Sequence, residues 1–75
     1  MRYFVNVGPE RGPILHLDTA GAIGVTEAPG RRMPVGLALR TGWDAAGRAL
    51  WRLVMHGENV PGCWLVVDRE FQPAQ

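Results

Sequence analysis

TGWDAAGRALWRLVMH, residues 41–56, is the stretch that decides the fold predicted from the sequence. Thr41 followed by Asp44 fits a capping box, in which the Thr41 hydroxyl caps the first turn of a helix and the Asp44 carboxylate reaches back to it. Gly57 then supplies the residue type that most often ends a helix. We therefore expect a helix over about residues 42–56.

The expected helix divides into a core-facing arc and an outer arc. Small and aliphatic residues share the core-facing arc: Ala46, Ala49, Leu50 and Leu53. The outer arc carries Arg48, Trp51 and Met55 with Arg52 at its flank, and Asp44 lies one turn before Arg48, where the two can pair. Aromatic residues, Met and Arg are enriched at the centres of protein interfaces. We predict that a partner binds to this arc through Arg48, Trp51, Arg52 and Met55.

Two alternatives for Trp51 remain open at this point. Its side chain could fold over the edge of the sheet or pack under the C-terminal residues near Phe71, since small domains use most of their tryptophans in the core. The same arc could instead join two copies of the chain in a symmetric homodimer.

Alternating apolar residues predict strands on both sides of the helix. The expected strands cover residues 2–7, 14–18, about 22–27, 33–40 and 63–69. Ile23 and Val25 form the apolar face of the third, and Met33, Val35, Leu37 and Leu39 form that of the fourth. Residues 71–75 are expected to be a flexible tail. The fold class is therefore α+β, with four to five strands in one antiparallel or mixed sheet, one helix on one face, and the order β-β-β-β-α-β.

Size and composition indicate one small globular domain over residues 1–75. A hydrophobic content of 47% with 20% charged residues is typical of folded domains and not of disordered chains. The single cysteine, Cys63, excludes an internal disulfide. No apolar run approaches the roughly 18 residues that a membrane helix needs, and the N-terminus is too interrupted for a signal peptide. We expect a cytoplasmic protein that does not span a membrane.

The residue inventory favours binding over catalysis. The chain has no serine and no lysine, so a Ser–His–Asp triad, a Schiff base and a phosphate-binding P-loop lysine are excluded. Cys63 with His16 or His56 as its base is the remaining nucleophile hypothesis, against which a lone cysteine in an apolar strand is usually a small buried residue. His16 and Asp18 are expected to form an exposed polar patch. No spacing suggests a zinc site, and we expect no catalytic residue, metal or cofactor.

Arginine supplies all eight basic residues of the chain. Arg11, Arg31 and Arg32 fall in turns, where they could hold RNA or single-stranded DNA by its phosphates. The net charge of only +1 provides no strong overall attraction to nucleic acid. Nucleic-acid binding is therefore the second functional hypothesis, and in the first one Arg31 and Arg32 extend the partner-binding surface.

The pattern T-x-x-D-A-A-x-x-A-L, from Thr41 to Leu50 after a series of strands, resembles HicB-type antitoxin domains, in which a capped helix packs on a small sheet. Those domains tend to place a P-G-C segment before the helix, whereas Pro61-Gly62-Cys63 follows it here, and we transfer no residue role. In size and lack of motifs the chain is similar to phage-encoded inhibitors of bacterial defence, such as anti-CRISPR proteins. The resulting hypothesis is a non-catalytic protein-binding domain that inhibits or regulates a larger bacterial complex, with an antitoxin-like homodimer as a further alternative.

Overall fold

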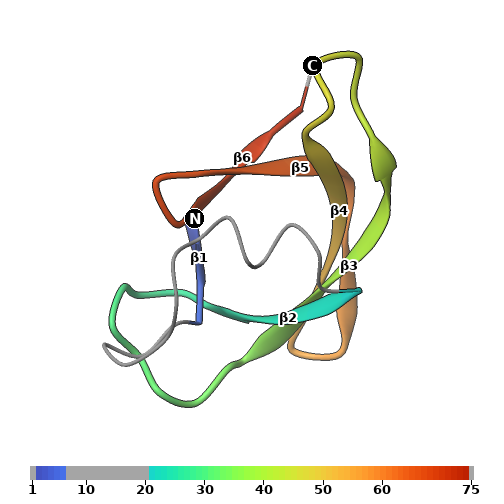
Figure 1. The fold of residues 1–75 in the computed structure, drawn as a ribbon. Helices are drawn as coiled ribbons and strands as arrows, with labels where there is room; N and C mark the ends of the chain where they lie inside the picture. The colour runs from blue at the N-terminus through green and yellow to red at the C-terminus, as the bar shows by residue number, and fades with distance from the viewer. Residues whose placement is uncertain (1, 7–20, 75) are drawn as a thin grey trace.

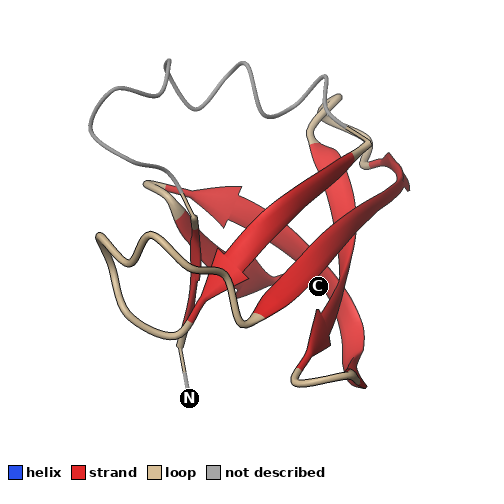
Figure 2. Cartoon of the chain, turned by 90° about the horizontal axis from the view of Figure 1, so that it is seen from below, coloured by secondary structure: helices blue, strands red, loops and turns tan. Residues whose placement is uncertain are grey.

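Six antiparallel strands close into a barrel (Figure 1). The computed structural model describes residues 2–6 and 21–74. The strands are β1 (Tyr3–Val5), β2 (Ala22–Thr26), β3 (Gly36–Trp43), β4 (Ala49–Met55), β5 (Glu58–Val67) and β6 (Glu70–Pro73). Each strand pairs with the next along the chain and β6 also pairs with β1, so the described strands wrap around one interior (Figure 2). No helix among the described residues is long and apolar enough to cross a membrane.

The predicted α+β fold is wrong, because the described residues form an all-β barrel without a helix. The stretch expected as a helix holds the end of β3, a turn and β4. Asp44 caps this turn and not a helix, since its Oδ1 accepts the backbone N–H groups of Ala46 at 2.9 Å and Arg48 at 2.8 Å. Gly47 has a φ of 82°, which suits the left-handed position of a hairpin turn and not a helix interior. The capped helix implied by the HicB resemblance is therefore wrong too.

Two tight turns connect the later strands in the way that antiparallel hairpins prefer. His56 and Gly57 have φ angles of 51° and 79°, and Asp68 and Arg69 have φ angles of 50° and 66°. Turns with two successive positive φ angles have the twist that matches antiparallel partners. Gly57, expected to end a helix, instead closes the hairpin between β4 and β5.

The strand predictions hold for part of the chain. The strands expected near residues 2–7 and 22–27 are confirmed as β1 and β2. The strands expected over 33–40 and 63–69 are present with other bounds, since β3 covers Gly36–Trp43 and β5 covers Glu58–Val67. The strand expected over 14–18 lies outside the described residues. The segment 71–75 was expected as a tail, but residues 71–73 belong to β6, which pairs with both β1 and β5.

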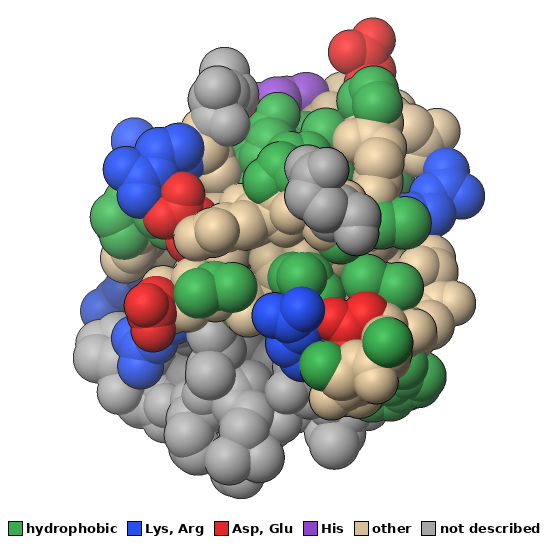
Figure 3. All heavy atoms as spheres, turned by 90° about the horizontal axis from the view of Figure 1, so that it is seen from above, with side chains coloured by type: hydrophobic (Ala, Val, Ile, Leu, Met, Phe, Trp, Pro, Cys, Tyr) green, Lys and Arg blue, Asp and Glu red, His purple; other side chains and the backbone are tan. Residues whose placement is uncertain are grey.

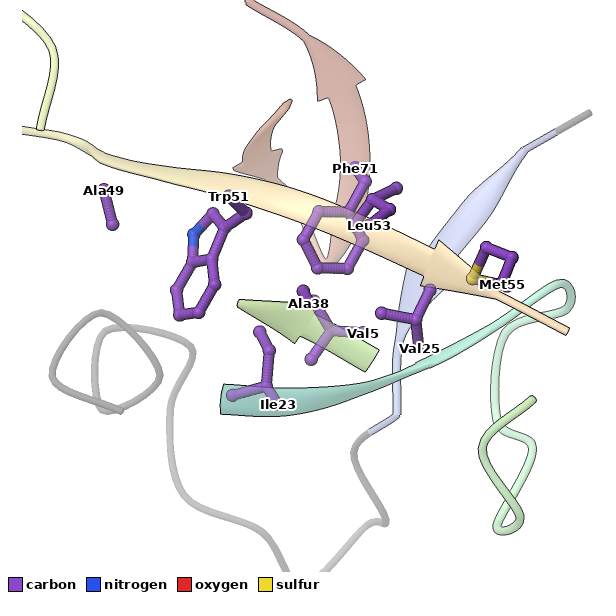
Figure 4. Close-up of a cluster of buried hydrophobic side chains, with 9 residues drawn as sticks. All are labelled: Val5, Ile23, Val25, Ala38, Ala49, Trp51, Leu53, Met55 and Phe71. Carbon is purple, nitrogen blue, oxygen red and sulfur yellow. The ribbon is translucent and has the colours of Figure 1, made fainter. Parts of the chain in front are cut away.

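Among the described residues, nine apolar side chains are buried in the interior of the barrel and are drawn in Figure 4: Val5, Ile23, Val25, Ala38, Ala49, Trp51, Leu53, Met55 and Phe71. β4 contributes four of them, because every second residue from Ala49 to Met55 points inward. Ile23 and Val25 are buried as predicted. β5 adds partly buried side chains to this cluster, among them Trp64 and Val66. Since bulky side chains occupy the centre, the inward positions that remain must be small.

Candidate interaction surface

The outer face of β3 and the segment before it carry a row of large apolar side chains that reach the solvent. Leu37 is 50% exposed and Leu39 is 41% exposed, while Val35 is 39% and Met33 is 79% exposed. We refer to these four residues as the β3 stripe. Scattered exposed apolar residues are ordinary on protein surfaces, whereas a continuous row of them marks an interaction surface more often.

The sequence pattern places the four side chains of the β3 stripe on one face of a strand, and the structure turns this apolar face toward the solvent. Gly36 and Ala38 face inward in their place, and Ala38 is 0% exposed. They pair with Met55 and Leu53 of β4, whose large side chains already occupy the interior. A Cβ at Gly36 would collide with the Met55 sulfur and with the carbonyl oxygen of Val54. Only small side chains fit on the inner face of β3, so the large ones lie outside.

The neighbours of the β3 stripe leave it prominent. On β2 the residues paired with its two leucines are Gly24 and Ala22, which are too small to cover them. On β4 the paired residues are Val54 and Arg52. The Arg52 Nη2 donates a hydrogen bond to Asn59 Oδ1 at 3.3 Å. The surface is therefore an aliphatic row with small residues, Pro34 and Asn6 on its β2 side and the positive charge of Arg52 on its β4 side.

The loop between β2 and β3 encloses a hollow beside the first residues of the β3 stripe. Its volume is about 360 Å³, and it is lined by Thr26, Glu27, Ala28, Arg31, Arg32, Met33 and Val35. The Thr26 hydroxyl donates to the Ala28 carbonyl at 2.7 Å, and the Asn6 side-chain amide donates to the Arg32 carbonyl at 3.0 Å. These bonds shape the loop and tie it to the residue that follows β1. We call this site the arginine hollow.

The residues predicted to bind a partner are divided between the surface and the interior. Trp51 is 0% exposed and Met55 is 5% exposed, so the exposed Trp–Met pair expected on a helix does not exist. The alternative in which Trp51 packs inside the domain agrees with the buried cluster, which also contains Phe71. Arg48 and Arg52 are exposed. Arg31 and Arg32 are exposed as well and line the arginine hollow.

The predicted pair of Asp44 and Arg48 is present, although in a turn and not on a helix. Arg48 Nε lies 2.8 Å from Asp44 Oδ2. The backbone N–H of Arg48, and then its guanidinium, hold the pKa of the Asp44 carboxyl below its ordinary value. The Arg2 guanidinium lowers the pKa of Glu70 in the same manner. On the face drawn in Figure 3, arginine and acidic side chains lie next to one another, so no single sign of charge dominates it.

Potential catalytic side chains do not converge in the described chain. Cys63 was expected to be buried, but it is exposed and lines one hollow together with Asp44 and Leu65. His56 lines a different hollow, where its Nε2 lies 2.8 Å from Glu27 Oε1. His16, Asp18 and Arg11 lie outside the described residues. Within residues 2–6 and 21–74, no group of three or more His, Cys, Asp and Glu is placed to hold a metal ion.

The sequence did not predict the exposed tryptophan at the end of β3. Trp43 is 53% exposed, and the Arg40 guanidinium carbon lies 5.1 Å from the centre of its ring. The register with β4 shifts between Arg40 and Gly42, so that Trp43 pairs with the inward-facing Ala49. Trp43 therefore lies on the other face from the β3 stripe, at the end of the barrel. A bulge of this kind leaves no mark in an alternating sequence pattern.

These features define a closed antiparallel barrel whose described surface bears an aliphatic stripe and an arginine-lined hollow. Comparisons of the chain with models of protein families, with curated proteins and with solved structures found no match. Function must therefore be inferred from the surface of the barrel itself.

Proposed function

We propose that this barrel is a non-catalytic protein-binding domain and that the β3 stripe is its contact surface. The observation that supports the proposal is the orientation of β3. Its small residues Gly36 and Ala38 point inward, and its large residues Leu37 and Leu39 point to the solvent. The outer positions of a strand that only completes the barrel make no core contacts, so polar residues would serve there equally well. The exposed part of each large aliphatic side chain at these positions gains free energy when a second surface covers it.

Burial of the stripe would contribute to the affinity of a complex but would not hold a complex together by itself. Full burial of a Leu side chain contributes about 1.5–3 kcal/mol. Because Leu37 is 50% exposed, a partner that covers it would add about 1 kcal/mol. The four residues together would add about 4 kcal/mol, which corresponds to a dissociation constant of about 1 mM before the costs of association. Polar contacts beside the stripe must supply the rest of the affinity.

Narrower hypotheses about the partner and the cell remain predictions. Inhibition or regulation of a larger bacterial complex, and a cytoplasmic location, are expectations from the sequence. The antitoxin-like homodimer uses the same surface, with a second copy of the chain as the partner. For the Cys63 enzyme hypothesis, His56 lines a different hollow from Cys63, and His16, the other candidate base, lies outside the described residues.

The test compares the double variant Leu37→Ser/Leu39→Ser with Val67→Ser. Val67 is a matched control because it is 39% exposed on the outer face of β5. Tagged proteins capture partners from a bacterial lysate, while thermal melting and light scattering report the fold and the mass of each variant.

We expect the stripe variant to bind the captured protein about 30-fold more weakly, since about 2 kcal/mol of burial is lost. Its melting temperature should stay within a few degrees of that of the wild type, and Val67→Ser should bind normally. A dimeric wild type with a monomeric stripe variant identifies the partner as a second copy. Equal capture by all three folded proteins would sink the proposal.

A further inference from the structure

We infer that the partner segment is acidic, and that one of its carboxylates binds in the arginine hollow while its large apolar side chains lie along the β3 stripe. The inference rests on the proposed function, because it assigns a chemistry to the partner of the same surface. It begins from continuity: Met33 and Val35 line the hollow and are also the first two residues of the stripe. A segment seated on the stripe therefore reaches the two arginines of the hollow.

Among the described residues, no carboxylate pairs with either arginine of the hollow. Arg31 and Arg32 are exposed, and neither has an ion-pair partner within residues 2–6 and 21–74. Arg2 and Arg48, by contrast, each contact a carboxylate of this chain. A guanidinium offers parallel N–H donors that match the two oxygens of a carboxylate. Charge complementarity therefore favours an acidic group in this hollow.

The acid that lines the hollow is engaged elsewhere. Glu27 Oε1 lies 2.8 Å from Nε2 of His56, which follows β4, and the described residues show no ion pair between Glu27 and either arginine. Ala28, Met33 and Val35 make part of the lining apolar. A methionine adapts its shape to different ligands, and Met33 is 79% exposed. The hollow thus combines positive charge with an apolar wall, which suits an acidic residue next to a large apolar one.

The same features disfavour a nucleic acid as the ligand. Proteins that bind single strands combine positive charge with aromatic rings on which bases stack, and none of the described residues that line the hollow is aromatic. Trp43 lies at the opposite end of β3 from the hollow. From Gly36 to Trp43 the strand spans about 23 Å at the rise of an extended strand. The residues between are the aliphatic β3 stripe. The described surface near Arg31 and Arg32 therefore fits a peptide better than a base.

Recognition must take place through side chains. Over residues 36–39, which include Leu37 and Leu39, β3 pairs with β2 on one side and with β4 on the other, so the backbone groups of this part of the strand are used within the barrel. A partner segment cannot add to β3 as a further strand in the manner of peptide-binding domains with an open edge. Specificity would therefore come from the pattern of acidic and apolar side chains on the partner.

The experiment is a titration of nitrogen-15-labelled protein followed by NMR, with the acidic peptide EEDLFDLLEE as the probe. Three control ligands separate the contributions of negative charge, apolar side chains and the peptide backbone. They are the charge-swapped KKNLFNLLKK, the peptide EEDSGDSSEE without large apolar residues, and a fifteen-residue oligothymidylate. The protein variants are Arg31→Glu and Arg32→Glu, with Arg69→Glu as a matched charge reversal in the turn between β5 and β6. Circular dichroism confirms that each variant is folded.

We expect EEDLFDLLEE to shift the amide signals of residues 27–39. Its affinity should fall about tenfold in each hollow variant, as it does when a charge-assisted hydrogen bond is lost, and stay unchanged in Arg69→Glu. Absence of shifts at about 1 mM peptide, equal binding of the charge-swapped peptide, or binding of the oligothymidylate alone would overturn the inference. If the stripe variant still loses capture from the lysate in that case, the proposed function stands without the acidic partner.

Discussion

Replacing Gly47 with alanine distinguishes the hairpin from the helix that the sequence pattern suggests, because the two structures predict effects of opposite sign. In a helix over residues 42–56, Gly47 would lie in the interior, where alanine is more stable than glycine by about 1 kcal/mol. In the barrel, Gly47 has a φ of 82° in the turn between β3 and β4. Alanine is strained in that conformation, so the same substitution should destabilise the fold.

The size of the effect follows from the geometry of the turn. A Cβ at Gly47 would meet no atom within 4 Å, so no steric clash contributes. The remaining cost is that of a left-handed backbone for an L-residue, about 1–2 kcal/mol. In a domain of this length, each kcal/mol lowers the melting temperature by about 4–8 °C. We therefore expect Gly47→Ala to melt roughly 5–15 °C below the wild type.

Thermal unfolding followed by tryptophan fluorescence measures this shift, and two further variants act as controls. Gly42→Ala, in β3, has open space and no positive φ, so it should be neutral or slightly stabilising. Gly47→Asn should recover part of the loss, since asparagine tolerates the left-handed conformation better than alanine. A Gly47→Ala variant that melts at or above the wild-type temperature would contradict the left-handed conformation of Gly47 in the turn.

Two further predictions test the core and the turn. Trp51→Ala removes a fully buried side chain and should cost about 3–5 kcal/mol, a large part of the roughly 4–11 kcal/mol expected for a domain of this length; chemical denaturation measures it, and a loss below about 1 kcal/mol contradicts the buried position. Asp44→Asn keeps an acceptor for the turn but loses the charge. Because the N–H groups of Arg48 hold the pKa of Asp44 below its ordinary value, the carboxylate stabilises the fold above about pH 4, and this contribution is lost as the pH falls through the lowered pKa. The wild type should therefore melt above Asp44→Asn at pH 7 and together with it near pH 2, and a constant gap would argue against the pairing.

The strands with a single apolar face were predictable, whereas the hairpin of β3 and β4 was not. Ile23 and Val25 alternate with small residues, so the inward face of β2 is evident from the sequence. β4 is apolar on both faces, because Leu50 and Val54 alternate with Trp51 and Leu53. Such a run satisfies the spacing of a helix as well as that of a strand.

The residues before β4 also favoured the wrong prediction of a helix. In the expected capping box, Asp44 would accept the backbone N–H of Thr41 before it, whereas in the turn it accepts those of Ala46 and Arg48 after it. An aspartate is favoured in both settings. Two alanines then follow, and alanine favours a helix. Gly47 was the contrary signal, since glycine in the middle of a helix is unfavourable and glycine after a short polar turn is typical of a hairpin.

The candidate site was misplaced because the inward face of β3 depends on volumes that a single strand does not contain. Alternation places Leu37 and Leu39 on one face and Gly36 and Ala38 on the other, but it does not say which face is inside. The choice is made by β4, which fills the interior opposite Gly36 and Ala38. Arg31 and Arg32 were predicted as binding residues from their position in a turn, whereas the hollow that they share with Met33 depends on the fold.

The replacement of the helix by β4 therefore exchanges the positions expected for the large apolar side chains. Trp51 turns from a surface anchor into the largest fully buried side chain of the described residues, and Met55 and Leu53 fill the interior opposite Gly36 and Ala38. Leu37 and Leu39 therefore lie outside. The exchange predicts two separable phenotypes. Changes at Trp51 should alter the free energy of unfolding and leave the affinity of the molecules that remain folded unchanged, whereas Leu37→Ser should weaken binding at nearly constant stability. Were Trp51→Phe to fold normally and lose binding while Leu37→Ser kept it, the barrel would have its contact surface on another face.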